Sequence, residues 1–470
     1  MKILLINPPT LAALDPALPK ILQEKEDPMP PLGLMYVAAY LKRESDCSVK
    51  ILDCQVEQIS HHDLIQKIKE ENPDFVGLTV MTFSLLAVLK TIKIIKKVDP
   101  SIKVILGGPH IHIYPHETLS FDEVDFVVLG EGEATFCELL SVLKNNGDLY
   151  RVKGIGFKEG KKTIVNELHE LITDLDSLPF PNRYELSYKK YVSALSERSP
   201  VTTMFTSRGC PFRCVFCNRP NLGKVFRWRS AQNVVDEIEE CCKVGIREIL
   251  IYDDTFTVNR QRVVDICENI LERKLDIYWD VRARVDTVDY ELLKLMAKAG
   301  CRRIHFGVEA GTQKVIDALR KGITLEKVEI AFASAKKASI RTLAYFMIGS
   351  PSETKEDILE TIKFAKKLDP DFAHFSITAP YPATELYAEG LKSGLLPFDY
   401  WKKFAENPSD DFEPMVWTEN LTKKELESLN KRAYRSFYWR PKYILKTLKN
   451  IKSPEDFIRK AGAGLKILKI

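Results

Sequence analysis

The sequence lacks the features that mark several large classes of protein. No apolar run reaches the roughly 18 residues that a membrane-spanning helix needs, and Met1–Pro8 does not have the pattern of a signal peptide. There is no repeat of fixed period, no low-complexity segment and no dominant charge, since 29% of residues are charged and the net charge is +4. These absences favour a cytoplasmic globular protein, and 470 residues allow two or three domains. Ten cysteines then indicate a reducing compartment rather than disulfides.

One short loop concentrates three thiols in the spacing C-x3-C-x2-C, directly after the strand-like run Val201–Thr206: Cys210, Cys214 and Cys217. Thiolates select iron–sulfur clusters or zinc. A closed zinc site needs a fourth ligand, and the nearest cysteines, Cys241 and Cys242, are adjacent, so they do not converge on one metal. A [4Fe-4S] cluster normally takes four thiolates. Three would leave one iron open to a substrate or cofactor, which is the interpretation that we favour over zinc.

The first 145 residues alternate predicted strands and helices. We expect strands over 2–7, 49–53, 75–80, 103–106 and 126–129, with helices over 32–42, 62–70 and 85–97. This alternation predicts a doubly wound, Rossmann-like parallel sheet that binds ligands at the carboxyl ends of its strands. Glycine pairs at those ends, such as Gly107-Gly108, permit close approach of a flat or phosphate-bearing ligand.

A second α/β region follows a predicted linker, residues 146–195, that contains a hairpin around 154–165. We expect six strands, over 201–206, 248–253, 277–281, 303–308, 342–348 and 372–378. Six βα units predict a partial (β/α)6 barrel of the TIM type, whose function lies at the carboxyl-end loops. The predicted domains are thus 1–145, the linker 146–195, a barrel over 196–396 and a helical, basic extension over 397–470.

The cysteine loop resembles the signature of the radical S-adenosylmethionine (radical SAM) superfamily, in which an aromatic residue, here Phe216, precedes the last cysteine. Later strand ends also match this family: Asp253–Phe256, Gly307–Gly311, Gly349–Thr354 and, with Ala383 where glycine is usual, Tyr381–Thr384. The resemblance implies that the open iron chelates S-adenosylmethionine and that an electron from the cluster splits it to a 5′-deoxyadenosyl radical. It further implies that the cofactor contacts Phe216, Asp253, Arg284 and Glu309. Guanidinium suits its carboxylate, and carboxylates suit its ammonium and ribose diol.

The first domain then resembles a cobalamin-binding domain, on the motifs NPP, PLGL at Pro31–Leu34, GGPH and GEGE. The resemblance implies cobalamin contacts from Thr79, Thr82, Gly107, Gly108, Glu131 and Gly132. One departure is that Asn7-Pro8-Pro9-Thr10 replaces the motif whose histidine coordinates cobalt in the methionine synthase kind. The lower axial ligand of the cobalt is therefore open, and the nearest candidates are His110, His112 and His116.

The basic charge is concentrated near the end of the chain, where residues 431–470 contain twelve Lys and Arg against two Asp and Glu. Helices over 442–449 and 457–470 would have apolar stripes and lysine-rich opposite faces. Such helices can lie on an anionic membrane at the inner face, or pack on the barrel with a solvated lysine face. We expect no nucleic-acid binding, because no recognised module accompanies the charge.

Together the two resemblances imply a cobalamin-binding radical SAM enzyme with three cofactors: a [4Fe-4S] cluster, S-adenosylmethionine and cobalamin. The predicted reaction is methylation of an unactivated carbon in a small-molecule or lipid substrate, with electrons from a flavodoxin or ferredoxin. Two alternatives stay open. One is a radical SAM enzyme of another outcome, such as ring formation, rearrangement or oxidation without methylcobalamin. The other is a non-catalytic cobalamin or redox sensor.

Overall fold

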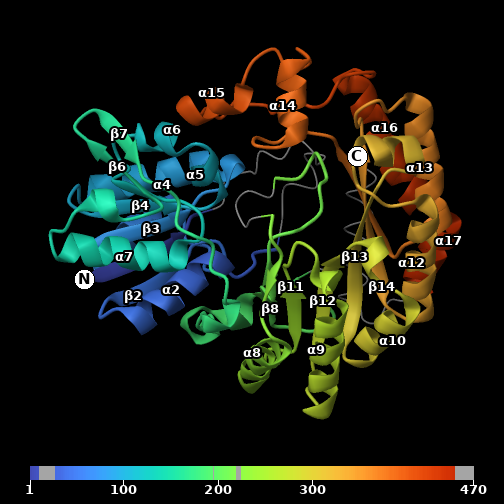
Figure 1. Ribbon diagram of the computed structural model, residues 1–470, viewed down its shortest axis with the longest axis horizontal. Helices are drawn as coiled ribbons and strands as arrows, with labels where there is room; N and C mark the ends of the chain where they lie inside the picture. Colours follow the sequence, from blue (N-terminus) through green and yellow to red (C-terminus); the bar gives the residue numbers. More distant parts are fainter. Residues whose placement is uncertain (10–26, 194, 219–223, 450–470) are drawn as a thin grey trace.

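The structure is a computed structural model that describes residues 1–9, 27–193, 195–218 and 224–449. Two α/β units lie side by side, the first drawn in blue and cyan and the second in green to orange (Figure 1). The helices α14 and α15 extend from the second unit toward the first.

The first sheet has seven strands in the order β2-β1-β3-β4-β5-β6-β7. They are β1 (Lys2–Asn7), β2 (Ser48–Asp53), β3 (Phe75–Thr79), β4 (Lys103–Gly107), β5 (Phe126–Val128), β6 (Ile155–Glu159) and β7 (Lys162–Val165). The first five pair in parallel, as predicted, but β6 and β7 add an antiparallel hairpin, so the sheet is mixed. The sheet therefore continues past residue 145 into the segment predicted as a linker. The boundaries at 145, 195 and 396 stay predictions.

Both faces of this sheet are buried, because alternate residues of β1 point to opposite helical layers. Leu4 and Ile6 share a core with the layer of α3 (His61–Glu71) and α4 (Leu85–Val98). Ile3 and Leu5 share another with the layer of α2 (Leu32–Glu44) and α7 (Gly132–Lys144). The short helices α5 (Pro109–Ile113) and α6 (Pro115–Leu119) follow β4. The strand order reverses between β1 and β3, which is where sheets of this kind form a ligand crevice.

The second sheet has the six parallel strands that the sequence predicts, in the order β15-β14-β13-β12-β11-β8. They are β8 (Val201–Met204), β11 (Glu248–Ile251), β12 (Tyr278–Ala283), β13 (Cys301–Glu309), β14 (Arg341–Ile348) and β15 (Phe372–Ile377). The helices between them are α8 (Ala231–Lys243), α9 (Arg260–Glu272), α10 (Tyr290–Lys298), α11 (Gln313–Ala318), α12 (Leu325–Lys337) and α13 (Lys355–Leu368). Each strand end that the sequence marks for function thus reaches the same edge.

Four C-terminal helices complete the fold: α14 (Glu385–Lys392), α15 (Tyr400–Glu406), α16 (Lys423–Tyr438) and α17 (Pro441–Lys449). α15 buries Trp401 in the core of the first domain, beside the α3–α4 layer. α16 lies along β15, the last strand of the barrel, where Asn430, Tyr434 and Tyr438 hydrogen-bond its backbone. The helix predicted over 457–470 lies outside the described residues. Among the helices that are described, none is long and apolar enough to cross a membrane.

Candidate active site

The cysteine loop starts where β8 ends, and a two-stranded ribbon closes its base. β9 (Ser207–Arg208) pairs antiparallel with β10 (Arg227–Trp228) on the far side of the loop. Within the loop, Cys210 is half-buried, Cys214 is buried and Cys217 is exposed. Backbone bonds at Val215 hold the middle of the loop, since its N–H donates to Leu319 and its carbonyl accepts from Leu386.

Two cationic side chains lie beside Cys214. The Arg284 Nη1 atom is 4.0 Å from its Sγ atom. Burial raises the pKa of the Cys214 thiol, and the charges of Lys321 and Arg284 oppose that rise. The same cations would stabilise the thiolate that a metal requires. The site is therefore electrostatically suited to an anionic, thiolate-ligated cluster.

Glu309 lies at the carboxyl end of β13 and pairs with Lys321, whose Nζ atom is 2.7 Å from Oε1. The backbone of Glu309 has a φ of +70°, and the register between β13 and β14 shifts just before it. A positive φ is unfavourable for a glutamate, and such strain is characteristic of functional sites. The Lys321 Nζ atom is also 5.9 Å from the centre of the Phe216 ring. Phe216, Glu309 and Cys214 thus surround one buried ammonium group.

Arg284 is held rigidly at the same place. Two of its nitrogens donate to the two oxygens of Asp286, at 2.9 and 2.8 Å. Its guanidinium stacks 3.7 Å from the centre of the Phe212 ring in the cysteine loop. It also donates to the Lys321 carbonyl at 2.8 Å. These contacts couple the end of β12 to the cysteine loop and to the Lys321 turn.

Asp253, which the resemblance implies as a cofactor contact, is engaged by hydrogen bonds within the protein. It is fully buried, and its carboxylate accepts bonds from the Thr206 N–H, the Thr206 hydroxyl and the Ser207 hydroxyl, all within 2.6 Å. Ser207 begins the ribbon of the cysteine loop and Thr206 directly precedes it, so Asp253 positions that loop. The adjacent Asp254 is exposed at the strand end.

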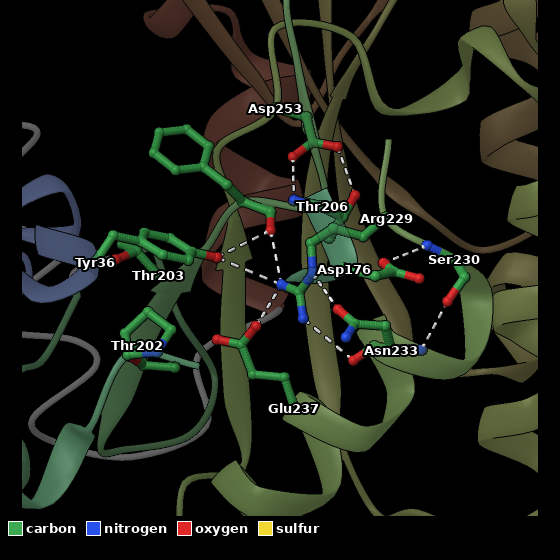
Figure 2. Close-up of polar contacts among 12 residues, drawn as sticks. Tyr36, Asp176, Thr202, Thr203, Thr206, Arg229, Ser230, Asn233, Glu237 and Asp253 are labelled. Atoms are coloured by element: carbon green, nitrogen blue, oxygen red, sulfur yellow. Dashed lines mark hydrogen bonds and ion pairs between the residues drawn. The ribbon is translucent and has the colours of Figure 1, made fainter. Parts of the chain in front are cut away.

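A buried ion-pair cluster contains Arg229, which directly follows β10, and Glu237 (Figure 2). Glu237 of α8 pairs with Arg229 and, at 2.5 Å, with Arg183. Burial alone would raise the pKa of Glu237, but the two guanidinium groups hold it below its ordinary range. Arg229 also donates to the Phe205 carbonyl at 2.9 Å and contacts the Tyr36 hydroxyl of α2 at 3.4 Å. The cluster thereby joins the barrel to the first domain.

A second ion-pair cluster makes the same connection through Glu131, which precedes α7. Arg208 and Arg227, which flank the cysteine loop, approach its carboxylate to 2.7 and 2.8 Å, and Arg208 also pairs with Glu133 at 2.5 Å. The Glu131 side chain is 3% exposed. Burial alone would raise its pKa, but the arginines hold it below its ordinary range. Glu131, expected at the cobalamin, is thus engaged in holding the two domains together.

The other residues implied for cobalamin lie at the carboxyl edge of the first sheet. Thr79 and Gly107 end β3 and β4 in register. Gly108 has a φ of +102°, and a Cβ atom there would lie 2.9 Å from the Val80 carbonyl oxygen, so only glycine fits. Gly132 starts α7, and the Thr82 hydroxyl lies 3.2 Å from the His110 ring. Beside them Met81 and Phe83 are each 37% exposed, which offers apolar surface to a flat macrocycle.

The three histidines proposed as cobalt ligands differ in their surroundings. His110 is fully buried beside Tyr114, burial lowers its pKa to about 4, and its Nε2 atom has no partner among the described residues. His116 contacts the Thr163 hydroxyl at 2.9 Å. Burial also lowers the pKa of His112. His110 is therefore neutral but enclosed by protein, so the structure does not favour any of the three as an axial ligand.

The three thiols of the cysteine loop are the donor type that iron–sulfur clusters take. In the described part of the chain, no three His, Cys, Asp or Glu side chains converge as the ligands of one metal ion do. The thiolates of a cubane cluster bind different irons, so they need not converge on a point.

Known protein families match both the region of the first sheet and the region of the barrel. The B12 binding domain family matches residues 20–140, and the radical SAM superfamily matches residues 204–365. An uncharacterised methyltransferase of Pyrococcus horikoshii is 36% identical over 451 residues, covering 95% of each chain. The chain belongs to the cobalamin-dependent radical SAM enzymes. This family uses a [4Fe-4S] cluster, S-adenosylmethionine and cobalamin, so the predicted cofactors are confirmed and the sensor alternative is set aside.

Other relatives of this family include a cyclase. The anaerobic magnesium-protoporphyrin IX monomethyl ester cyclase of Cereibacter sphaeroides is 32% identical over 419 residues, covering 87% of this chain and 67% of the cyclase. Among solved structures, OxsB with aqua-cobalamin and S-adenosylmethionine bound superposes with a TM-score of 0.77 at 18% identity. The match covers 99% of this chain and 72% of OxsB. TsrM of Kitasatospora setae, a methyltransferase, superposes with a TM-score of 0.67 at 20% identity. The match covers 83% of this chain and 75% of TsrM. These two likenesses show the fold alone.

Lys321 is the main site residue that the sequence did not indicate. It lies in a loop after α11, between Arg320 and Gly322, which both have positive φ. A lysine in such a turn is normally a solvated surface residue, and only the fold shows that this one is 9% exposed and paired with Glu309.

Proposed function

We propose that the enzyme transfers a methyl group to an unactivated carbon of a small-molecule substrate, with Cys210, Cys214 and Cys217 holding the [4Fe-4S] cluster. When bound, the cluster supplies the electron that cleaves S-adenosylmethionine, and cobalamin carries the methyl group. The observation that carries the proposal is the pairing of Glu131 with Arg208 and Arg227. This pairing fixes the carboxyl edge of the first sheet beside the cysteine loop. Groups held at the two edges would therefore face the same substrate.

The contacts proposed for S-adenosylmethionine are Phe216, Arg284 and Glu309, with Asp254 in place of Asp253. Glu309 is supported by its strained backbone and by its place beside Cys214 and Lys321. Asp254 is supported by its exposure at the end of β11, because its carboxylate remains available to an ammonium group. Lys321 and Arg284 would stabilise the negative charge of the thiolates.

The contacts proposed for cobalamin are Thr79, Thr82, Gly107, Gly108 and Gly132. Hydroxyl groups and close backbone approach at a strand edge suit a nucleotide tail. The exposed Met81 and Phe83 side chains suit the corrin ring. Glu131 would act through Arg208 and Arg227, by holding this edge against the barrel.

Ring formation is the second candidate, because the Cereibacter cyclase is 32% identical to this chain. The methyltransferase of Pyrococcus horikoshii is more similar and matches over nearly its whole length, which favours methyl transfer.

Two partners belong to the same proposal: a flavodoxin or ferredoxin as electron donor in a reducing cytoplasm, and an anionic membrane surface. Support for the membrane comes from α17, of which two lysines pair with carboxylates of the barrel. Lys442 pairs with Asp369, and Lys446 pairs with Asp371. The apolar side chains on the other side are about half exposed: Ile444, Leu445 and Leu448. A helix with an outward apolar face and basic flanks can lie on anionic lipid, so a lipid substrate would also be accessible.

The test is anaerobic reconstitution with iron, sulfide and cobalamin, followed by S-adenosylmethionine carrying a ¹³C-methyl group and an extract of the source cells. We expect corrinoid absorbance, an iron–sulfur spectrum, 5′-deoxyadenosine release and one extract metabolite that gains the labelled carbon. A product that lacks the label but forms with 5′-deoxyadenosine would favour ring formation. One tetrahedral zinc in place of iron would contradict the whole proposal.

A further inference from the structure

The inner face of the six-stranded sheet is accessible to solvent. Along β14 and β15, the outward side chains Phe346 and Phe375 are fully buried under the helices. The inward side chains between them, Tyr345 and His374, keep partial exposure. The interior of a closed TIM barrel is filled by packed side chains. Here the inward side chains are partly exposed, so the inner face is available to a ligand.

Arg282 of β12 is a half-buried cation on this face without a charged partner within 4 Å. Its guanidinium lies 4.3 Å from the centre of the Tyr252 ring, and no hydrogen bond or ion pair within 4 Å is found for it among the described residues. Among the described residues, all buried arginines but one have a carboxylate within 4 Å: Arg183, Arg208, Arg227, Arg229, Arg284 and Arg303. The exception, Arg262, donates instead to the carbonyls of Arg229 and Thr206. A half-buried cation with no anion of the chain within 4 Å is suited to an anionic ligand.

A chain of hydrogen bonds orients a second donor, the Tyr345 hydroxyl group, on the same inner face. Arg303 pairs with Asp280, and its Nε–H donates to the His305 Nε2 atom at 3.0 Å. Since burial favours neutral His305, its single ring proton lies on Nδ1, 3.1 Å from the Tyr345 hydroxyl oxygen. The Tyr345 oxygen thus accepts this bond, and its own O–H proton remains to be donated.

These two donors lie deeper than the cofactor contacts proposed above. Arg282 lies on β12, two residues before Arg284, which directly follows the strand, so Arg282 lies about 7 Å further from the edge that bears the cysteine loop. Tyr345 pairs in register with Gly307, two residues before Glu309. Burial and the Asp253 charge raise the pKa of Asp254, and the charge of Arg282 opposes that rise, although no ion pair within 4 Å joins Asp254 and Arg282.

We infer that Arg282 and Tyr345 bind an acidic group of the substrate, a carboxylate or a phosphoryl group, on the inner face of the barrel. This inference rests on the proposed function and adds the chemical class of the substrate. The Asp280–Arg303–His305 chain acts as a positioning device, because it fixes the direction in which Tyr345 donates. The acidic group would anchor the substrate below the cluster and leave its carbon skeleton toward the carboxyl edge.

The test uses phenylglyoxal, an arginine reagent, on the reconstituted enzyme saturated with S-adenosylmethionine, with modified peptides quantified by mass spectrometry. Inorganic phosphate and benzoate are the two probes. We expect at least one of them to protect Arg282, and Tyr345→Phe to weaken that protection about tenfold. The matched control is Arg302, which stacks 4.2 Å from the Tyr278 ring and should not be protected. The probe that protects more strongly distinguishes a phosphoryl from a carboxylate substrate.

Four results would overturn the inference. Protection of Arg282 by S-adenosylmethionine alone would assign the arginine to the cofactor. Equal protection of Arg302, or unchanged protection in Tyr345→Phe, would mean that no specific anion site exists. Failure of Arg282 to react in the absence of any anion would show that the inner face is closed. Because labelling does not require turnover, failure here is distinct from failure of methyl transfer, which the labelled-methyl experiment reports.

Discussion

The carboxylate of Glu353 should make the stability of the protein depend on pH near neutrality. Glu353 is 1% exposed, its Oε2 atom accepts the N–H groups of Gly349 and Ser350 at 2.6 and 2.8 Å, and its Oε1 atom has no partner among the described residues. Burial, as the largest cause, raises its pKa from 4.5 to about 7 against these two bonds. Each tenfold change in proton affinity is worth about 1.4 kcal/mol, so the shift amounts to about 3 kcal/mol.

The sign follows from the direction of the shift. The folded state holds the proton of Glu353 more tightly than the unfolded chain, so the stabilisation is complete below pH 4.5 and is lost as the pH rises through about 7. Glu353→Gln keeps an oxygen acceptor but cannot ionise. Its free energy of unfolding, relative to the wild type, should therefore increase by about 2–3 kcal/mol between pH 5 and pH 8. Anaerobic urea denaturation followed by tryptophan fluorescence measures this difference.

Glu427→Gln, on the exposed side of α16, is the control for the general effect of removing a carboxylate. If wild type and Glu353→Gln change in parallel from pH 5 to pH 8, the burial argument for Glu353 is wrong.

Three further predictions concern the site and the surface. Cys214→Ala should abolish the iron–sulfur spectrum and 5′-deoxyadenosine release but preserve corrinoid uptake by the first domain, and loss of both would argue against separable sites. Glu131→Gln leaves Arg208 and Arg227 without their shared anion and should lower the free energy of unfolding by about 3–5 kcal/mol, whereas Glu138→Gln, on the exposed side of α7, should have little effect. Replacing Ile444, Leu445 and Leu448 together by Gln should reduce sedimentation with phosphatidylserine vesicles, while Ile330→Gln, an equally exposed site on α12, should not; unchanged sedimentation would refute the membrane contact.

The elements of the fold could be predicted because each one is encoded locally. Apolar runs mark the strands, and the cysteine spacing identifies the loop after the first barrel strand. The hairpin around 154–165 was also predicted, but not its addition to the first sheet, because strand pairing depends on contacts that local pattern does not specify.

The connections between the domains could not be predicted for the same reason. Glu131 and Arg227 are 96 residues apart, and nothing near either residue indicates the other. Glu131 follows a glycine at a strand end, which is equally compatible with a ligand contact. Asp253 also has the right residue type at the right strand end, and only the fold reveals that Thr206 and Ser207 occupy its oxygens.

The position of α16 has a consequence for how the chain can be shortened. A half-open barrel ends in a strand with unpaired peptide groups, and here Tyr434 and Tyr438 supply the missing partners from the side. A shortened chain that stops before Lys423 would expose a ready template for intermolecular strand addition. Such a truncation should emerge from size-exclusion chromatography as multimers, and α16 would then be a guard against self-association as well as a support for the barrel.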